Sequence, residues 1–573
     1  MDKFQRLLIL FVGIVPALLA LSCANQVPPE GGPIDTSPPE IISTYPPPYT
    51  LFYSDHVLEF EFDKYVDHRS FEESIFISPF IPDLEFDWSG KHVGVTFRGT
   101  LRKNTTYVVN IGTDVKDLRS PPNRLAQAFT LAFSTGGTID RGGIRGKVFP
   151  MTSKDPAEGV MIFAYQLAHT NPDTINPRTL SPDYITQTGT GGNFYLRHLE
   201  LGSYRIIAVR DEYRNLLYDP EADEFGVPPH DVLLTQQDTL LDNVLLQLAK
   251  EDTTAPRLIR AEAIDVHHVD IEFSEALDTS SAKPVIVSIA DTLSGNHLKA
   301  VSVFPKLPSL SSFMVVTDRQ DSSKPYRITI DSAYDRVGLP IIQKSNFLVF
   351  MGSSIADTLL PAASVVGVQD SSRGVQLKPT ILIQFSDAVQ RSTFSNAIAL
   401  NDTSNTGIPV SLDWLNDAAC AVKVVGELAS KTWYKLSIVT YNGLNWEGKR
   451  FHDSLKVVHF QSLDAEELSS IEGTVVNAIT TEKAKSIVVV AEGLESKNEE
   501  SYSTIADQKG NFLIQGIEEG RYVLHAFNDR NRNGKYDAGC PLPFAGSEQF
   551  NYATDTLKVR ARWPLEGVTI ELR

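Results

Sequence analysis

The segment Leu58-Glu59-Phe60-Glu61-Phe62-Asp63 decides the fold, because apolar and acidic side chains alternate along it without a break. A period of two places one set of side chains in a core and the other in water, as a strand of a β-sandwich requires. The same alternation returns at residues 269–275 and 381–387. The sequence therefore predicts three copies of one strand, each inside a copy of one β-structured unit.

Other features recur at matching places around this strand. Each unit opens with Asp-Thr-x-x-Pro, contains a second strand built on a tyrosine, and closes with a strand that holds a phenylalanine. The opening aspartates are Asp35, Asp252 and Asp357, the tyrosines are Tyr107, Tyr326 and Tyr434, and the phenylalanines are Phe133, Phe350 and Phe460. The interval from tyrosine to phenylalanine is 26, 24 and 26 residues. These repeats predict domains at 35–137, 252–353 and 357–462.

A second kind of unit occurs twice. Gly192-Asn193-Phe194-Tyr195-Leu196 parallels Gly510-Asn511-Phe512-Leu513-Ile514, at an offset of 318 residues. The same offset joins the Leu-x-x-Gly-x-Tyr that ends at Tyr204 to its partner at Tyr522, and an Ile-x-Gly-x-Val strand precedes each copy. The repeat predicts two further domains, at 139–250 and 469–573.

The first three units resemble the bacterial Ig-like domain of the S-layer type, and the other two resemble the transthyretin-like, carboxypeptidase-regulatory-like domain. The resemblance implies an all-β fold, a tandem array of five Ig-like and transthyretin-like β-sandwiches. In the second kind of unit, glycines are expected in tight turns and aromatic residues in a small core. Modules of these families serve as spacers and binding platforms, so the resemblance carries a fold rather than a reaction.

The N-terminus predicts export and lipidation. Lys3 and Arg6 precede an apolar run over residues 7–21, which is too short for a membrane span but suits a secretory signal. The run ends in Ala20-Leu21-Ser22-Cys23, which resembles a bacterial lipoprotein cleavage site. This predicts a signal peptide at 1–22 and acylation (palmitate) at Cys23; the alternative is an ordinary signal peptide with a chance cysteine. The Pro-rich residues 23–48 are predicted to form a tether.

The whole chain resembles an Ig-domain outer-membrane lipoprotein of Bacteroidota. The resemblance implies a lipid anchor in the outer membrane. No acidic cluster follows Cys23 directly, so the sequence leaves both the periplasmic and the cell-surface side open.

Composition excludes several classes of protein. The chain has 573 residues, which predicts about four to six domains. Its 71 acidic against 52 basic residues give a net charge of −19, which argues against binding nucleic acid. Three cysteines cannot form a disulfide framework, and Cys420 and Cys540 fall in different predicted domains.

One loop could hold a cation. Residues 529–537 place oxygen-bearing side chains at positions 1, 3, 5 and 9 of a calcium-type loop, with Gly534 at position 6. The predicted ligands are Asp529, Asn531, Asn533 and Asp537. Cys540 stands at position 12 in place of a bidentate Glu, and the repeat partner at 211–219 has lost position 3 and the glycine. The alternative is an Asx-type turn that closes a hairpin.

A short motif, Asp-[Ser/Thr] followed by an apolar residue or Thr, resembles the O-glycosylation sequon of Bacteroidota. The predicted acceptors are Thr174, Thr239, Thr253, Thr292, Ser332, Thr358, Ser454 and Thr556. Thr253 and Thr358 also lie in the opening Asp-Thr turn, where a turn-capping role would explain them equally well.

No catalytic motif is present, so the chain is predicted not to be an enzyme and to need no cofactor apart from the possible Ca²⁺. His-Glu-x-x-His, Gly-x-Ser-x-Gly and phosphate-binding loops do not occur. The adjoining His267 and His268 fall on a predicted strand, where neighbours face opposite ways, which favours one at the surface and one in the core.

Two classes of function remain. The favoured one is a lipid-anchored scaffold or binding protein, a subunit or partner of an outer-membrane β-barrel complex, with export or assembly machinery or other envelope lipoproteins as partners. The alternative is an accessory protein that binds or processes carbohydrate. Such a protein would be expected to cluster tryptophans, and the five of this chain are scattered.

Overall fold

The computed structural model describes residues 35–79, 81, 83–150, 157–168, 171–279, 283–394, 396–477, 486–494, 501–553 and 555–572. The predicted signal peptide and Cys23 lie outside these residues. The described chain is built of β-strands, with one short α-helix and a few 3₁₀ helices, so the predicted all-β fold is confirmed. Among the described residues, no helix is long and apolar enough to cross a membrane.

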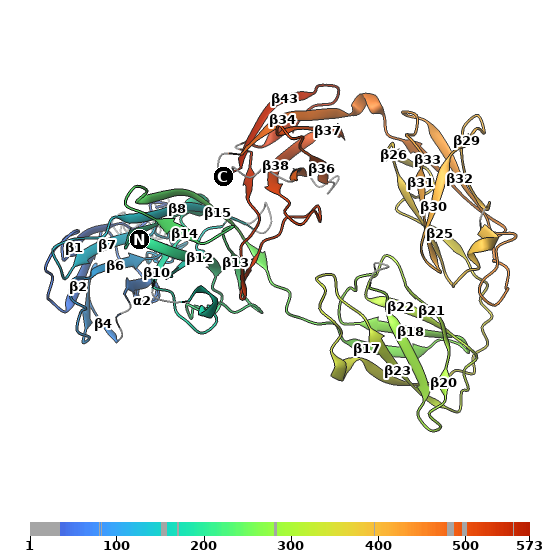
Figure 1. Ribbon diagram of the computed structural model, residues 1–573, viewed down its shortest axis with the longest axis horizontal. Coiled ribbons are helices and arrows are strands. Elements are labelled where there is room, and N and C mark those ends of the chain that lie inside the picture. The colour runs from blue at the N-terminus through green and yellow to red at the C-terminus, as the bar shows by residue number, and fades with distance from the viewer. Residues whose placement is uncertain are drawn as a thin grey trace, which may run out of the picture. The chain divides into compact units, whose positions relative to one another are not determined.

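The strands gather into separate sandwiches (Figure 1), which we number as modules 1 to 5 in chain order. The chain divides into two compact units. One holds the residues up to Arg141 together with Thr186–Thr190, and the other holds the rest. The first unit is therefore module 1 with one short added segment, and modules 2 to 5 make up the second.

Module 1 packs a four-stranded sheet on a three-stranded one. The orders are β1 (Ile41–Tyr45), β2 (Val57–Phe62), β5 (His92–Phe97), β4 (Leu84–Ser89), and β3 (Ile75–Ser78), β6 (Thr106–Ile111), β7 (Phe129–Ser134). The helix α2 (His68–Glu72) is capped by Asp67, which accepts a hydrogen bond of 2.8 Å from Ser70 N–H. The strand β1 lies within the Pro-rich segment predicted to be a tether. It is an edge strand, where proline is tolerated.

Modules 3 and 4 repeat this plan with more strands. The sheets of module 3 are β17 (Leu258–Ala263), β18 (His268–Phe273), β22 (Ser312–Thr317), β21 (Ala300–Pro305), and β20 (His297–Leu298), β19 (Ile286–Asp291), β23 (Pro325–Ser332), β24 (Phe347–Met351). Those of module 4 are β25 (Ala363–Val366), β27 (Thr380–Phe385), β31 (Ala419–Val424), β30 (Val410–Asn416), and β26 (Ser372–Val375), β33 (Leu455–Ser462), β32 (Trp433–Val439), β28 (Ile398–Asp402), β29 (Gly407–Ile408).

Modules 2 and 5 share a different plan, in which the last long strand pairs parallel with the first. In module 2 the sheets are β11 (Asn193–Leu199), β8 (Gly142–Phe149), β15 (Leu240–Gln247), and β10 (Tyr184–Gln187), β9 (Met161–Gln166), β12 (Gly202–Arg210), β13 (Glu224–Gly226), β16 (Ala249–Lys250), with β14 (Val232–Leu234) beside β12. In module 5 they are β37 (Asn511–Ile517), β34 (Ser469–Asn477), β43 (Leu565–Leu572), and β36 (Ser501–Ile505), β35 (Ile487–Gly493), β38 (Gly520–Asn528), β41 (Phe550–Tyr552), with β42 (Leu557–Val559) beside β38, plus the hairpin β39 (Cys540–Pro541) and β40 (Phe544–Ala545). The strands β15 and β43 run parallel to β8 and β34.

The repeated tyrosines and phenylalanines of modules 1, 3 and 4 form one cross-strand pair. Tyr107 lies directly opposite Phe133, and their rings stack at 5.5 Å between centroids. Tyr326 pairs with Phe350, and Tyr434 with Phe460, in the same way. Each tyrosine hydroxyl also accepts a hydrogen bond from the backbone N–H five residues earlier. The constant interval in the sequence therefore reflects the return of the next strand to the same register.

Glycines in modules 2 and 5 do more than form turns. Gly192 and Gly510 have a positive φ, as a turn requires. Gly146 and Gly473 instead lie within β8 and β34, and a Cβ at either would come within 2.7 Å of a phenylalanine ring and closer still to a backbone carbonyl. These two glycines are needed because the aromatic ring packs directly on the backbone of the neighbouring strand.

Candidate functional site

The Ig-like repeats bring three distant positions to one corner of each sandwich. The first is the opening Asp, the second follows the alternating strand by two residues, and the third lies in a later loop that bridges back to the chain just after the second. We call this place the corner. Its members are Asp35, Lys64 and Asp117 in module 1; Asp252, Glu275 and Asp335 in module 3; and Asp357, Asp387 and Asn445 in module 4.

The corner of module 1 is neutralised from within. Lys64 Nζ lies 3.0 Å from Asp35 Oδ2 and 3.9 Å from Asp117 Oδ2. Asn123 donates to both oxygens of Asp117, through its backbone N–H and its side-chain amide, at 2.9 Å each. The buried carboxylate of Asp117 is thus fully hydrogen-bonded, and the lysine ties the opening segment to the sandwich.

The corner of module 4 is completed by a histidine from module 3. His268 Nε2 lies 3.3 Å from Asp387 Oδ1, and its Nδ1 lies 2.9 Å from Asp265 Oδ2. Asn445 donates from Nδ2 to the other oxygen of Asp387 at 2.7 Å. All four side chains are buried. Because both ring nitrogens face carboxylate oxygens, both must donate, and only the imidazolium can do so.

Electrostatics favour the same charge state. Burial alone would lower the pKa of His268, but the hydrogen bond and charge of Asp387, followed by the charge and hydrogen bond of Asp265, outweigh it and raise the pKa to about 9. Asp357 also offers a carboxylate oxygen within 4.8 Å of the ligand atoms of Asp265 and His268. The arrangement is therefore a buried cation shared by carboxylates of two modules.

A second row of charges borders this cluster. His267 Nε2 lies 3.1 Å from Glu447 Oε1, and Lys449 Nζ lies 2.7 Å from Glu447 Oε2 and also pairs with Asp357. The ring of Trp446 meets that of His267 edge-on at 5.4 Å. The adjoining histidines thus both face module 4, which corrects the expectation that one of them lies at the surface. Their surroundings come from the next module, about 120 to 180 residues further on, which a strand pattern does not reveal.

Apolar contacts join the same two modules. Phe304 and Val316 of module 3 belong to the core cluster of module 4, and Met314 packs against it. Ser302 Oγ donates to Asp417 Oδ2 at 2.8 Å across this contact. Modules 3 and 4 therefore share a buried interface with both an apolar and a charged part.

Modules 2 and 5 also pack together, although 318 residues separate their matching positions. Phe149 of β8 stacks on Tyr552 at 4.6 Å and meets Phe550 edge-on at 5.6 Å. The guanidinium of Arg205 lies 3.9 Å from the ring centre of Phe544. These contacts are aromatic and largely desolvated, the kind that dominates interface energies.

The predicted calcium loop has the hydrogen bonds of a turn. Asp529 is buried and accepts from Asn533 N–H at 3.1 Å and from Gly534 N–H at 2.9 Å. Asp537 accepts from the side-chain amides of Asn531 and Asn533. The repeat partner has the same frame, with Asp211 accepting from the N–H groups of residues 215 and 216. The geometry is thus the same in both modules, and calcium at 529–537 stays a prediction.

One residue of this loop was not found from the sequence. Glu548 is buried, and its two oxygens accept from Arg530 N–H at 2.6 Å and from Asp537 N–H at 3.3 Å, which joins the two ends of the loop. In module 2, Asp223 does the same for residues 212 and 219. The two carboxylates do not share the 318-residue offset, so the repeat gave no signal for them.

The predicted glycosylation sites are all accessible to some degree. Six are exposed, and Thr239 and Ser332 are half-buried. In the opening turns, the aspartate accepts the backbone hydrogen bond, as Asp252 does from Thr254 N–H at 3.1 Å. Modification of these residues stays a prediction.

The family model for the bacterial Ig-like domain matches residues 35–135 and 357–445. Among solved structures, the chain is similar to domains 1–6 of the surface layer protein SbsC, with 11% identity over 91% of this chain and 68% of that one and a TM-score of 0.18. It is also similar to the N-terminal part of the bacterial S-layer protein SbsC (13% identity, 36% and 44% covered, TM-score 0.16) and to L,D-transpeptidase 3 from Mycobacterium tuberculosis (12% identity, 27% and 46% covered, TM-score 0.15). The match thus spans less than half the length of these last two structures. No curated protein matches the chain. Residues 35–135 and 357–445 therefore carry bacterial Ig-like domains within an all-β chain.

Proposed function

We propose that this chain is a non-enzymatic scaffold, anchored to the bacterial outer membrane by lipid at Cys23, and that it holds a partner of an outer-membrane β-barrel complex. The observation that carries the proposal is the way in which modules 2 to 5 are joined. Modules 3 and 4 share the buried His268 cluster, and modules 2 and 5 share the stack on Phe149. Such contacts hold neighbouring modules in a fixed relation, which a scaffold requires.

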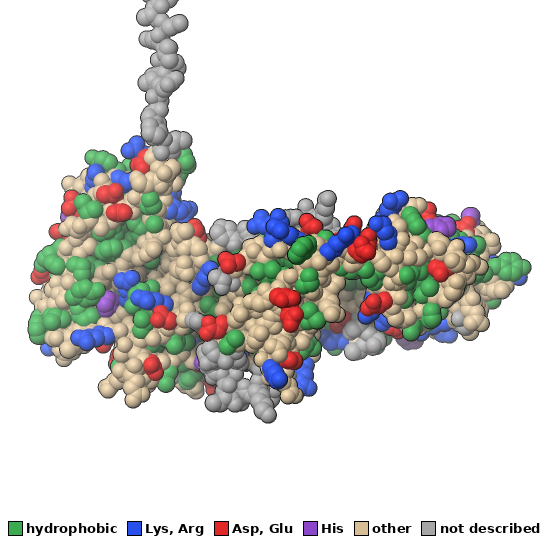
Figure 2. Space-filling view, turned by 90° about the horizontal axis from the view of Figure 1, so that it is seen from above, with side chains coloured by type: hydrophobic (Ala, Val, Ile, Leu, Met, Phe, Trp, Pro, Cys, Tyr) green, Lys and Arg blue, Asp and Glu red, His purple; other side chains and the backbone are tan. Residues whose placement is uncertain are grey.

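An exposed sheet edge supports contact with a protein partner. The strand β24 is the last of its sheet, and Phe347, Val349 and Met351 are all exposed on it. Edge strands with apolar side chains are surfaces on which another chain can add a strand. On the face shown in Figure 2, acidic and basic side chains are interspersed with no broad basic area, which favours a protein partner over nucleic acid.

The tryptophans do not favour the carbohydrate alternative. Trp88 stacks on His68 at 4.0 Å, and Trp414 packs in the core cluster of module 4. Trp433 and Trp446 are half-buried, which leaves Trp563 as the one exposed tryptophan of the five. A flat aromatic platform for a sugar ring would need several exposed rings side by side.

The proposal predicts what is recovered with the protein from its own envelope. A tagged chain extracted in mild detergent should bring down a β-barrel protein and other lipoproteins in near-stoichiometric amounts, identified by mass spectrometry. Cys23→Ala should abolish acylation, release the chain from the membrane fraction, and reduce this recovery at least tenfold. Cys540→Ser is the matched control, because it removes a cysteine that carries no predicted lipid.

Recovery of the wild-type protein alone would contradict the proposed partner. Membrane retention of Cys23→Ala at the wild-type level would contradict the proposed anchor.

A further inference from the structure

Three carboxylates meet in the corner of module 3 without a cationic side chain among them. Asp252, Glu275 and Asp335 each offer an oxygen, and these oxygens all lie within 4.8 Å of one another. Within the part of the chain that the structure describes, none of the three forms an ion pair. Carboxylates this close repel one another, so the corner needs a positive charge from elsewhere.

Two oxygens of the corner are buried without a hydrogen-bond partner. Asp335 is 1% exposed, and its Oδ1 accepts from the N–H groups of residues 337, 338 and 339 at 2.6 to 3.0 Å. Its Oδ2 and Glu275 Oε1 are buried and have no partner among the described residues. A buried carboxylate oxygen without a donor is costly, and native structures rarely keep one without a ligand.

The two sibling corners show what is missing. In module 1, Lys64 occupies the position of Glu275 and places its ammonium group between the two aspartates. In module 4, the amide of Asn445 occupies the position of Asp335, while Lys449 and His268 supply positive charge. The same fold thus balances two of its corners with protein cations and leaves the third with three acids.

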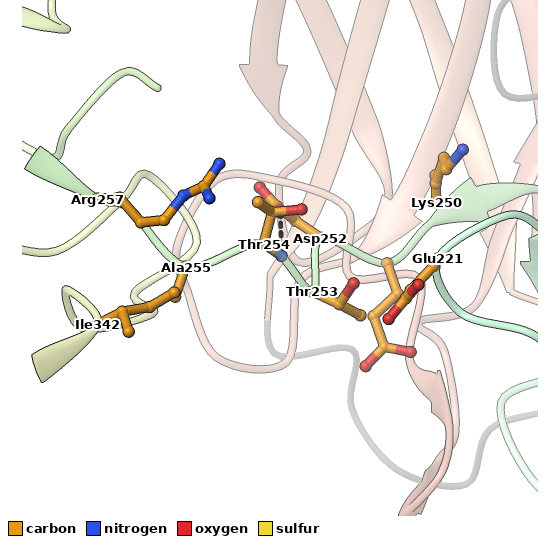
Figure 3. Close-up of a pocket in the computed structure, with 9 residues that line it drawn as sticks. Glu221, Lys250, Asp252, Thr253, Thr254, Ala255, Arg257 and Ile342 are labelled. Carbon is orange, nitrogen blue, oxygen red and sulfur yellow. Dashed lines mark hydrogen bonds between the residues drawn. The ribbon is translucent and has the colours of Figure 1, made fainter. Parts of the chain in front are cut away.

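The surroundings leave the corner accessible. Asp252 lines an open pocket of about 650 Å³, in which Glu221 and Lys250 lie on one side of the segment from Asp252 to Ala255, and Arg257 and Ile342 on the other (Figure 3). Burial, with the charges of Asp252 and Asp335, raises the pKa of Glu275, and the charge of Arg257 opposes this only in part. Neither Lys250 nor Arg257 pairs with the three acids in the described residues.

We propose that Asp252, Glu275 and Asp335 bind a divalent cation of the Ca²⁺ class at the junction of modules 2 and 3. Hard divalent cations take carboxylate oxygens as ligands, and an ion at this place would give Asp335 Oδ2 and Glu275 Oε1 the partner they lack. It would also tie Asp252, which belongs to the connection between the modules, to the body of module 3. The site is distinct from the loop at 529–537.

The test uses the full mature chain, stripped with chelator and titrated separately with Ca²⁺ and with Mg²⁺ in a calorimeter. Glu275→Lys is the decisive variant, because it installs the residue that module 1 has at this position. We expect it to bind one equivalent of cation fewer than the wild type and to remain folded by circular dichroism. Asp335→Asn, which makes the third position resemble Asn445, should also lose one equivalent.

Two controls separate this site from other acids. Asp331→Asn removes an exposed carboxylate of the same module, and Asp529→Asn removes the first ligand of the predicted loop; both should keep the equivalent that Glu275→Lys loses. In thermal melts, saturating cation should raise the unfolding temperature of the wild type by about 5 °C and leave Glu275→Lys unchanged. Equal stoichiometry in the wild type and Glu275→Lys, or no binding of either cation by the wild type, would overturn the proposal.

Discussion

Replacing His268 with Ala should lower the free energy of unfolding of the joined modules 3 and 4 by about 3–5 kcal/mol, because it leaves buried carboxylates without their cation. Asp387 and Asp265 would each lose a charged hydrogen bond, and Asp357 lies close by. Hydrogen exchange followed by mass spectrometry would report the loss in β18 and β27. His297→Ala is the matched control, since His297 is an exposed histidine of the same module.

The same cluster makes stability depend on pH. The pKa of His268 is about 9 in the folded protein against an ordinary value of 6.5, so folding favours the protonated ring. The stabilisation is therefore complete below about pH 6.5 and is lost as the pH rises through 9. His268→Ala should have a flatter profile over this window. A variant as stable as the wild type at pH 6, or with the same fall up to pH 9, would contradict the buried imidazolium.

Replacing Arg205 with Met should destabilise module 2 by about 3–5 kcal/mol and loosen its contact with module 5. The guanidinium is buried and binds Asp231 through two hydrogen bonds, of 3.0 and 2.9 Å, and donates a third to Pro172 O at 2.7 Å. Its face lies against Phe544. Urea unfolding monitored by hydrogen exchange in β12 and in residues 540–545 would measure both effects.

A conservative variant sharpens this prediction. Arg205→Lys keeps the charge but not the planar fork, so it should recover only part of the loss. Arg197→Met is the control, because Arg197 is exposed and its guanidinium lies 4.3 Å from the ring centre of Tyr195 within module 2. If Arg205→Met and Arg197→Met were equally stable, the buried arginine would not contribute as the structure implies.

Local patterns predicted the strands well because each strand carries its own evidence. The alternation at Phe60 and Phe62 states which face is buried, and both rings are fully buried in β2. The repeated tyrosine and phenylalanine also fixed a pairing, since they stand opposite each other in all three modules in which they recur.

The candidate site could not be found in this way, because it forms between modules. His268 meets Asp387, 119 residues away, and nothing in either strand's own pattern points to the other. The corner did leave a signal, since Lys64, Glu275 and Asp387 follow the same strand at the same distance. Only the structure shows that the position lies beside the opening aspartate, where a change from lysine to glutamate matters.

The central claim is that modules 2 to 5 form one joined scaffold, and a cross-link between modules 2 and 5 tests it most directly. Lys147 and Thr569 are both exposed and line one cavity of about 730 Å³. In a chain that carries Cys540→Ser, Lys147→Cys and Thr569→Cys, a short bis-maleimide reagent should form an intramolecular cross-link in most molecules. Each single-cysteine chain serves as a control. Cross-linking no greater than in these controls would contradict the joined scaffold.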